Sequence, residues 1–120
     1  MYNYLLVFIG GGLGSVCRYG IAHLLASQNY TFPLATFLAN VISCIVLGFF
    51  VGLSMKAGVS DLQKLMIMTG FCGGFSTFST FTNETFQLFQ AGNFFYAISN
   101  IIVSLMVCLV CIYIGIKLAG

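Results

Sequence analysis

The sequence predicts an all-α membrane protein with four transmembrane helices, the third of which is broken. Hydrophobic residues make up 60% of the 120 positions and charged residues only 5%, whereas a soluble domain carries about 25% charged residues. The mean hydropathy is +1.07. Four apolar stretches each reach the length of about 20 residues that a membrane-spanning helix needs. We therefore expect residues 1–120 to form a single four-helix transmembrane domain.

The four stretches leave only short connections between them, with no room for a soluble domain. They run roughly over Asn3–Ala26, Pro33–Met55, Leu62–Phe89 and Phe94–Leu118. No lysine or arginine precedes the first stretch, so we expect it to be retained as a span and not cleaved as a signal peptide.

The positive charges give only a weak bias in orientation. With four spans, both termini and the second connection lie on one side of the membrane. That side carries Lys56, Lys64 and Lys117, while Arg18 lies toward the opposite end of the first span. Because cytoplasmic segments are enriched in lysine and arginine, this distribution favours one orientation by three to one. It leaves insertion in both orientations open.

The first span contains a glycine cluster followed by an arginine. A dinucleotide site is disfavoured, because no acidic residue follows the cluster at about 20 positions. Close helix packing through Gly10 and Gly14 is the better interpretation. Arg18 is costly in a membrane unless it finds a partner or reaches the interface. Two readings stay open: an interfacial position, or a vestibule charge that attracts anions.

Polar and small residues recur every four positions in the second and fourth spans, which places them on one face of each helix. The two sets are Thr36, Asn40, Cys44, Gly48 and Gly52, and Tyr96, Asn100, Ser104 and Cys108. Face to face, they would form a hydrogen-bonding track through the protein. The alternative is that they only allow the helices to pack closely.

The third span contains the most unusual segment. Residues Gly70–Phe81 hold three glycines, four hydroxyl side chains and four phenylalanines. We expect the glycines to break the helix and to free backbone carbonyls, which a hard cation prefers as ligands. Irregular backbone at membrane depth is tolerated only inside protein or along a cavity.

Downstream of the glycines, Phe78 and Phe81 share a helix face, and their ring edges carry partial positive charge that could attract a small anion. Thr80 and Glu84 lie on an adjacent polar face with Ser76. Phenylalanines at this spacing are also consistent with simple packing.

The five cysteines are predicted to act as small buried hydrophobic residues. All lie inside the predicted spans, and none belongs to a metal-binding motif. Cys108 and Cys111 have the spacing of a redox pair but lie in an apolar helix without a βαβ context. There is no acid–base pair and no nucleophile with a partner, so we expect no enzymatic activity. The absence of an acidic or basic face argues against nucleic acid as a ligand.

Three segments together resemble the CrcB/Fluc family of fluoride channels over essentially the full length. They are Gly11–Tyr19, Thr36–Asn40 with Gly48, and Gly70–Phe81. The resemblance implies a homodimer of antiparallel subunits in the inner plasma membrane, with two fluoride pores. It implies passive export of fluoride that reduces its toxicity. It also implies a structural sodium ion at the dimer centre, bound by the main-chain carbonyls of Gly73 and Ser76.

The resemblance also assigns pore residues. Phe78 and Phe81 match the phenylalanines whose ring edges face fluoride, and Asn40 matches the pore asparagine of the second span. Further polar positions are Thr36, Thr80, Glu84, Asn100 and Ser104. In the fourth span, Asn100, Ser104 and Cys108 are placed by spacing alone. Asn100 and Cys108 depart from the tyrosine and serine that the family often has.

Two other functions remain as alternatives. A small multidrug exporter has a similar length but needs a membrane-embedded acid, and those with this architecture carry a glutamate in the first span. Here the first span has no acid, and Glu84 is the only intramembrane carboxylate. A non-transporting assembly subunit would explain the small-residue stripes but not the hydroxyl-rich break.

Overall fold

The computed structural model describes residues 2–26 and 32–120, which are helical apart from short turns and one interruption. The helices are α1 (Tyr2–Leu24), α2 (Leu34–Lys56), α3 (Asp61–Gln63), the π-type helix η1 (Lys64–Cys72), α4 (Gly73–Phe75), α5 (Phe78–Gln90) and α6 (Phe94–Ala119). The expected connection at Gln28–Phe32 lies outside the described residues except for Phe32.

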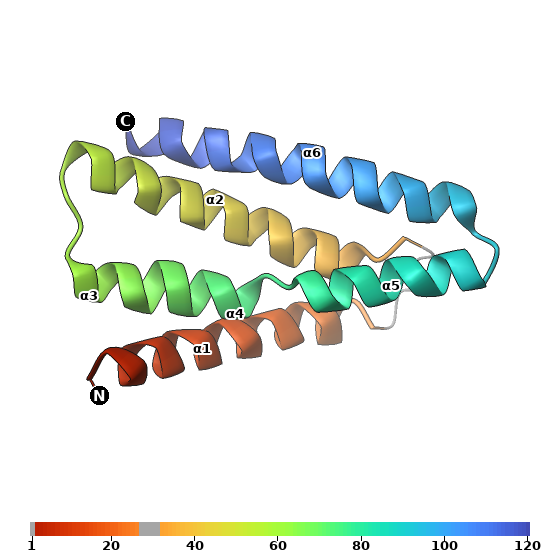
Figure 1. Ribbon diagram of the computed structural model, residues 1–120, viewed down its shortest axis with the longest axis horizontal. Helices are drawn as coiled ribbons and strands as arrows, with labels where there is room; N and C mark the ends of the chain where they lie inside the picture. Colours follow the sequence, from red (N-terminus) through yellow and green to blue (C-terminus); the bar gives the residue numbers. More distant parts are fainter. Residues whose placement is uncertain (1, 27–31) are drawn as a thin grey trace.

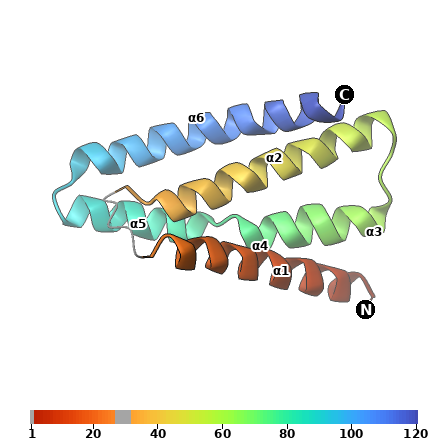
Figure 2. The same ribbon diagram turned by 180° about the vertical axis from the view of Figure 1, so that it is seen from behind.

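The helices form four elongated bodies that run alongside one another (Figure 1). The third body consists of α3, η1, α4 and α5 in sequence, and is called the broken third helix below. It lies between α1 on one side and α2 on the other, and α6 covers α2 (Figure 2). Both chain ends and the α2–α3 turn lie at the same end of the molecule, which is the arrangement that four crossings require.

The predicted spans are confirmed to within two residues at their ends. Three helices, α1, α2 and α6, are long and apolar enough to cross a membrane, with mean hydropathies of 1.5, 2.3 and 2.6. The broken third helix runs alongside these three over a comparable length. The chain is thus a multi-pass, all-helical membrane protein.

The position of the break differs from the prediction. Gly70 lies within η1, and Gly73 and Gly74 form the start of α4, so the glycines are helical. The chain becomes extended only at Ser76 and Thr77, with φ/ψ of −83/159° and −153/127°. The expectation that the glycines themselves interrupt the helix is therefore wrong.

The glycines instead allow α1 and the broken third helix to approach each other closely. A methyl group at Gly10 would overlap the Met66 carbonyl oxygen, and one at Gly14 would overlap that of Phe71. From the other side, a methyl group at Gly74 would overlap the Gly11 carbonyl oxygen. This confirms the predicted packing role of Gly10 and Gly14. It also explains why a glycine-rich stretch remains helical, because helices in lipid associate through close packing of small residues.

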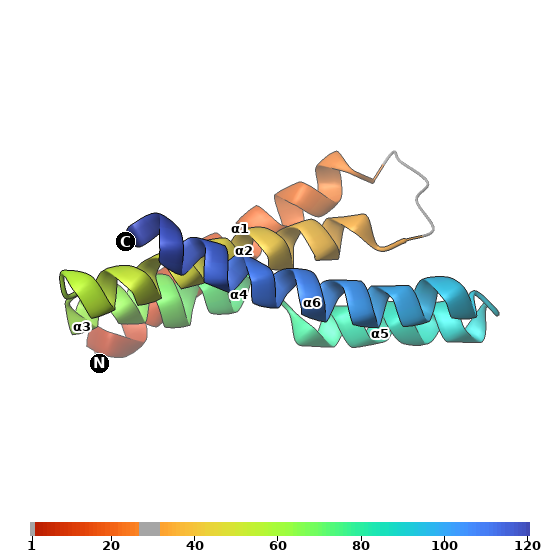
Figure 3. The ribbon, with the colours of Figure 1, turned by 90° about the horizontal axis from the view of Figure 1, so that it is seen from above.

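Helices α2 and α6 run in the same direction (Figure 3) and pack closely over their C-terminal halves. A methyl group at Gly48 would overlap the Ile112 carbonyl oxygen, and one at Gly52 would crowd that of Ile116. Near the chain end, Lys56 Nζ donates a hydrogen bond to the Gly120 carbonyl at 3.5 Å, with a sequence separation of 64. The same separation relates Gly48 to Ile112 and Gly52 to Ile116, so the two helices keep one register.

Turn chemistry sets where the helices begin and end. Ser60 and Gln63 form a reciprocal capping box at the start of α3, with both hydrogen bonds at 3.2 Å, which satisfies two otherwise free backbone donors. The turns before α3 and α6 contain Gly58 and Gly92 at φ values of +79° and +83°. These conformations are ones that glycine adopts without steric cost.

Candidate functional site

The break in the third helix creates a new helix start in the middle of the protein. Thr77 caps α5, because its hydroxyl accepts a hydrogen bond from the Thr80 backbone N–H at 3.2 Å. A Ser or Thr at this position satisfies one of the donors that a helix start leaves free. Side chains from neighbouring helices bind some of the other backbone groups at the break.

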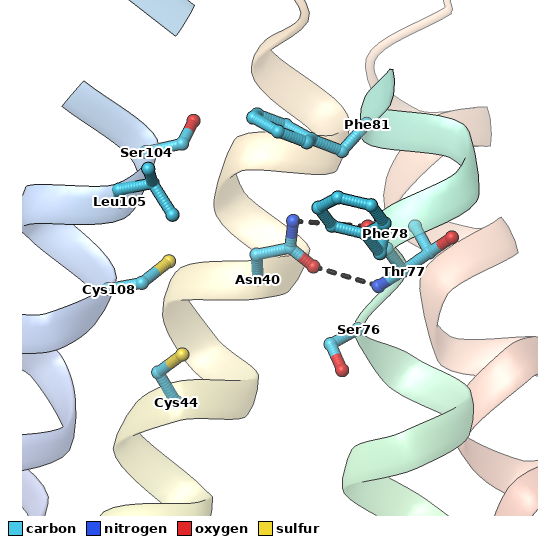
Figure 4. Close-up of a pocket in the computed structure, with 9 residues that line it drawn as sticks. All are labelled: Asn40, Cys44, Ser76, Thr77, Phe78, Phe81, Ser104, Leu105 and Cys108. Carbon is cyan, nitrogen blue, oxygen red and sulfur yellow. Dashed lines mark hydrogen bonds between the residues drawn. The ribbon is translucent and has the colours of Figure 1, made fainter. Parts of the chain in front are cut away.

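Asn40 of α2 binds the backbone of Thr77 with both ends of its amide (Figure 4). Its Oδ1 accepts a hydrogen bond from Thr77 N at 3.0 Å, and its Nδ2 donates one to Thr77 O at 3.5 Å. Because the amide nitrogen carries two hydrogens, one remains for another acceptor. Asn40 therefore both fixes the extended segment and retains a donor.

Two side chains on neighbouring helices, Ser43 and Arg18, also bind backbone carbonyls just before the break. The Ser43 hydroxyl of α2 donates to the Cys72 carbonyl at 3.1 Å, and Ser76 donates to the same oxygen at 2.7 Å. From the opposite side, Arg18 Nε of α1 donates to the Gly74 carbonyl at 3.3 Å. The guanidinium thus binds a helix C-terminal carbonyl, where positive charge is favourable. Arg18 therefore has a backbone partner at the break. Neither of the two interpretations drawn from the sequence, an interfacial position or a vestibule charge, included this hydrogen bond.

A cavity of about 220 Å³ opens beside the break, between α2, α6 and the broken third helix. Among the residues that the structure describes, none with a charged side chain lines it. Its walls combine an amide, hydroxyls, thiols and two aromatic rings, contributed by Asn40, Cys44, Ser76, Thr77, Phe78, Phe81, Ser104, Leu105 and Cys108. The structure therefore brings together Asn40, Ser76, Phe78, Phe81 and Ser104 of the predicted site.

The two phenylalanines have different surroundings although both line this cavity. Phe81 is 9% exposed, whereas Phe78 is 75% exposed. Their ring centroids are 6.0 Å apart and the rings are tilted by 38°. Most of the Phe78 side chain is therefore uncovered in a single chain.

A chain of buried hydrogen bonds runs from the cavity wall to Phe81. The Ser104 hydroxyl donates to Asn100 Oδ1 at 3.1 Å, and Asn100 Nδ2 donates to the Thr85 hydroxyl at 2.8 Å. Thr85 in turn donates to the Phe81 carbonyl at 2.8 Å. Asn100 is only 1% exposed, so its amide serves to join α6 to α5 behind the cavity and does not line it.

The other predicted pore positions also lie away from this cavity. Thr36 is buried. The backbone N–H of Thr80 donates a hydrogen bond to the Thr77 hydroxyl. Glu84 lines a separate cavity of about 210 Å³ near the start of α2. Its Oε1 is buried and has no hydrogen-bond partner among the described residues.

The two carbonyls predicted to bind sodium lie at the break. Gly73 is exposed, and a methyl group there would have no neighbour within 4 Å. Within residues 2–26 and 32–120, no side chain and no backbone N–H outside the regular helices donates a hydrogen bond to the carbonyl oxygen of Gly73 or Ser76. Oxygen donors of this kind are suited to a hard cation.

Sequence reasoning missed three residues that build the site: Ser43, Thr77 and Thr85. Thr77 had a readable signal, since a threonine directly before a helical pattern is typical of a helix N-cap. Ser43 and Thr85 had none, because their partners are a backbone carbonyl and an asparagine on other helices.

Comparison with known proteins identifies the family of this chain. Residues 5–116 match the family model described as CrcB-like protein, Camphor Resistance (CrcB). Relatives named fluoride-specific ion channel FluC include one from Azobacteroides pseudotrichonymphae, 45% identical over 84% of this chain and 82% of the relative. Another, from Pyrococcus abyssi, is 41% identical over 96% of this chain and 94% of the relative.

A third FluC relative, from Phocaeicola vulgatus, is 40% identical over 88% of this chain and 92% of its own length. All three names describe ion channels, which agrees with the expectation that this chain is not an enzyme. The match to the family model covers nearly the whole chain. This chain belongs to the CrcB-like protein family.

Proposed function

We propose that this protein is a fluoride-specific ion channel that lets fluoride leave the cytoplasm passively. Relatives of that name align over most of the chain. The single observation that carries the proposal is the uncharged cavity at the break, where Asn40 and Ser104 face two aromatic rings. A conducting site must bind its ion strongly enough to admit it and weakly enough to release it.

The donors at this cavity can replace the water of a small anion in steps. Asn40 Nδ2 has one hydrogen beyond the one it donates to Thr77. The only hydrogen of the Ser104 hydroxyl is donated to Asn100, so Ser104 must rotate away from Asn100 to bind an anion. When the ion moves on, the Ser104 hydroxyl can form its hydrogen bond to Asn100 again. Edges of the Phe78 and Phe81 rings would add weak attraction.

We propose further that the working unit is a homodimer of antiparallel subunits with two pores. Support comes from the polar and aromatic surface that one chain leaves uncovered beside its cavity. Phe78 is 75% exposed, and Gly73 is exposed without neighbours within its own chain. The three-to-one distribution of basic residues between the two ends is compatible with insertion in both orientations.

A sodium ion at the dimer centre fits the residues present. The Gly73 and Ser76 carbonyls of two chains would supply four oxygen donors. Bound there, the cation would fasten the two breaks together and offset part of the cost of an anion in a low-dielectric protein. We place the dimer in the inner plasma membrane.

Fluoride efflux from liposomes tests the function. Protein-containing liposomes loaded with fluoride should release it down its gradient with an ionophore present to balance charge, and chloride-loaded liposomes should retain their ion. The multidrug-exporter alternative predicts no fluoride release beyond that of empty liposomes. Fluoride release equal to that of empty liposomes, together with dye uptake driven by a proton gradient, would establish that alternative.

Gly73→Ala tests the dimer. The added methyl group meets nothing in one chain, so the fold should survive while the dimer at the proposed centre weakens. Native mass spectrometry or light scattering in detergent would measure the monomer fraction. Gly12→Ala is the matched control, because Gly12 is also an exposed helical glycine without neighbours. Equal dimer fractions in both variants would remove Gly73 from the interface.

A further inference from the structure

We propose that Cys44 and Cys108 form a two-thiol site for a soft divalent metal ion, such as Hg²⁺, inside the cavity at the break. Nothing in the sequence pairs these cysteines, because they lie on different helices and match no metal motif. Their pairing follows from the packing of α2 against α6.

The register of the two helices places the cysteines side by side. Gly48 contacts Ile112 and Gly52 contacts Ile116, and Lys56 bonds to Gly120 with a separation of 64 residues. Cys44 and Cys108 have the same separation and lie one turn earlier on each helix. Because both helices run in the same direction, the two residues occupy the same level.

The two thiols line the same cavity. Figure 4 shows both cysteine side chains in the space between α2 and α6. Both side chains are only partly buried, so an ion that enters the cavity can reach them.

The chemistry of the pair selects the metal. Thiolates are soft ligands that prefer soft metals, and the thiolate is the form that binds. Within residues 2–26 and 32–120, no group of three or more His, Cys, Asp or Glu side chains is arranged to hold a metal. Two thiols without further ligands suit an ion that accepts two ligands in line, and they disfavour zinc, which takes four.

Charge balance also favours a divalent ion. Each thiol gives its proton to water, each sulfur forms one bond to Hg²⁺, and the ion loses its water or chloride ligands. The product has two Hg–S bonds and no net charge, and two protons have left the site. A neutral product avoids the cost of burying an unpaired charge among apolar helices. A monovalent ion such as Ag⁺ would leave a net negative charge.

Metal retention in the presence of a competing thiol tests the site. The probe is HgCl₂, added to detergent-purified protein in which Cys17 is replaced by serine and Cys72 and Cys111 by alanine, followed by washing with excess 2-mercaptoethanol. A two-thiol chelate should resist the wash by about 100-fold or more relative to a single thiol, since the second bond forms within one molecule. One Hg per chain should remain by native mass spectrometry.

Cys44→Ser or Cys108→Ser in that background should each lose the retained metal. Equal retention in either variant would overturn the site. If the triple replacement does not fold, the natural chain answers the same question. Cys108→Ser should then lose one wash-resistant Hg per chain, whereas Cys17→Ser should lose none, because Cys17 is exposed and lies on another helix.

Fluoride efflux distinguishes the thiol site from the proposed channel function. The expected block of efflux rests on that function, whereas metal binding does not. Bound Hg²⁺ should stop fluoride release from liposomes, and excess dithiothreitol should restore it. Retained metal with undiminished efflux would support the thiol site and contradict conduction through this cavity. Metal lost on washing would overturn the thiol site while leaving the channel proposal intact.

Discussion

The Asn40 side chain brackets the backbone of Thr77, accepting from its N–H at 3.0 Å and donating to its carbonyl at 3.5 Å. A side chain on α2 thereby replaces helical hydrogen bonds that the chain gives up between α4 and α5. Extended backbone inside a membrane requires such replacement, because lipid offers no hydrogen bonds. The same amide reaches the cavity, so the residue that stabilises the break also contributes to the candidate ion site.

Asn40→Asp should separate these two roles. Aspartate keeps an acceptor for Thr77 N–H, so the break should remain formed. Its negative charge would repel an anion by about 4 kcal/mol at about 4 Å in a partly screened site, which is enough to lower fluoride efflux by at least about 100-fold. Liposome efflux and a melting curve measure the two effects. A natural efflux rate would show that Asn40 serves only to stabilise the break.

Replacing either cavity phenylalanine should lower fluoride efflux. The two replacements should differ in how much they lower the stability of the protein. Phe81→Ile removes a buried ring and should reduce both efflux and melting temperature. Phe78→Ile should reduce efflux with little loss of stability in a single chain, because Phe78 is 75% exposed. Phe95→Ile, on α6 and 77% exposed, is the control that should change neither. Unaltered efflux in both cavity variants would exclude the rings from conduction.

Thr85→Val should destabilise the protein although the two side chains have the same shape. The substitution leaves Asn100 Nδ2 without its acceptor at a site that is 1% exposed, and such a loss costs about 1–3 kcal/mol. Thr82→Val is the matched control, since the Thr82 hydroxyl also bonds to backbone of its own helix but is exposed. Thermal unfolding in detergent compares them. Identical melting temperatures would mean that the buried bond contributes no net stability.

Gly74→Ala should weaken the packing of α1 against the broken third helix. The methyl group would overlap backbone atoms of Gly11, which cannot move aside as a flexible side chain could. Overpacking of this kind costs about 1–3 kcal/mol. Gly12→Ala should be neutral or slightly stabilising, because it meets nothing and alanine favours helix. The prediction fails if Gly74→Ala unfolds at the same temperature as the natural chain.

The sequence predicted the spans and part of the site because local composition and periodicity determine both. The number of crossings follows from length and hydropathy, and the four-residue recurrence of Asn40 and Ser104 reflects a shared helix face. The place of the break did not follow, because glycine is both a helix breaker and the residue that lets helices touch. Only the position of Gly11 opposite Gly74 decides between those roles.

The shared cavity position of Cys44 and Cys108 could not be predicted from the sequence either. Each cysteine read alone is a small apolar residue, and their proximity depends on the register of α2 against α6. The sequence spacing showed that both helices have polar faces, but it did not show which turn of one helix meets which turn of the other.

The pairing of α2 with α6 has a consequence for biosynthesis. Thirty or more residues of the broken third helix and its turns leave the ribosome after α2 and before the partner that α2 requires. The cavity wall that carries Ser104 is therefore made after α2 and after the broken third helix. A nascent chain that stalls before residue 94 would hold an unpaired Gly48 and Gly52 surface in lipid, exposed to membrane chaperones and quality-control proteases.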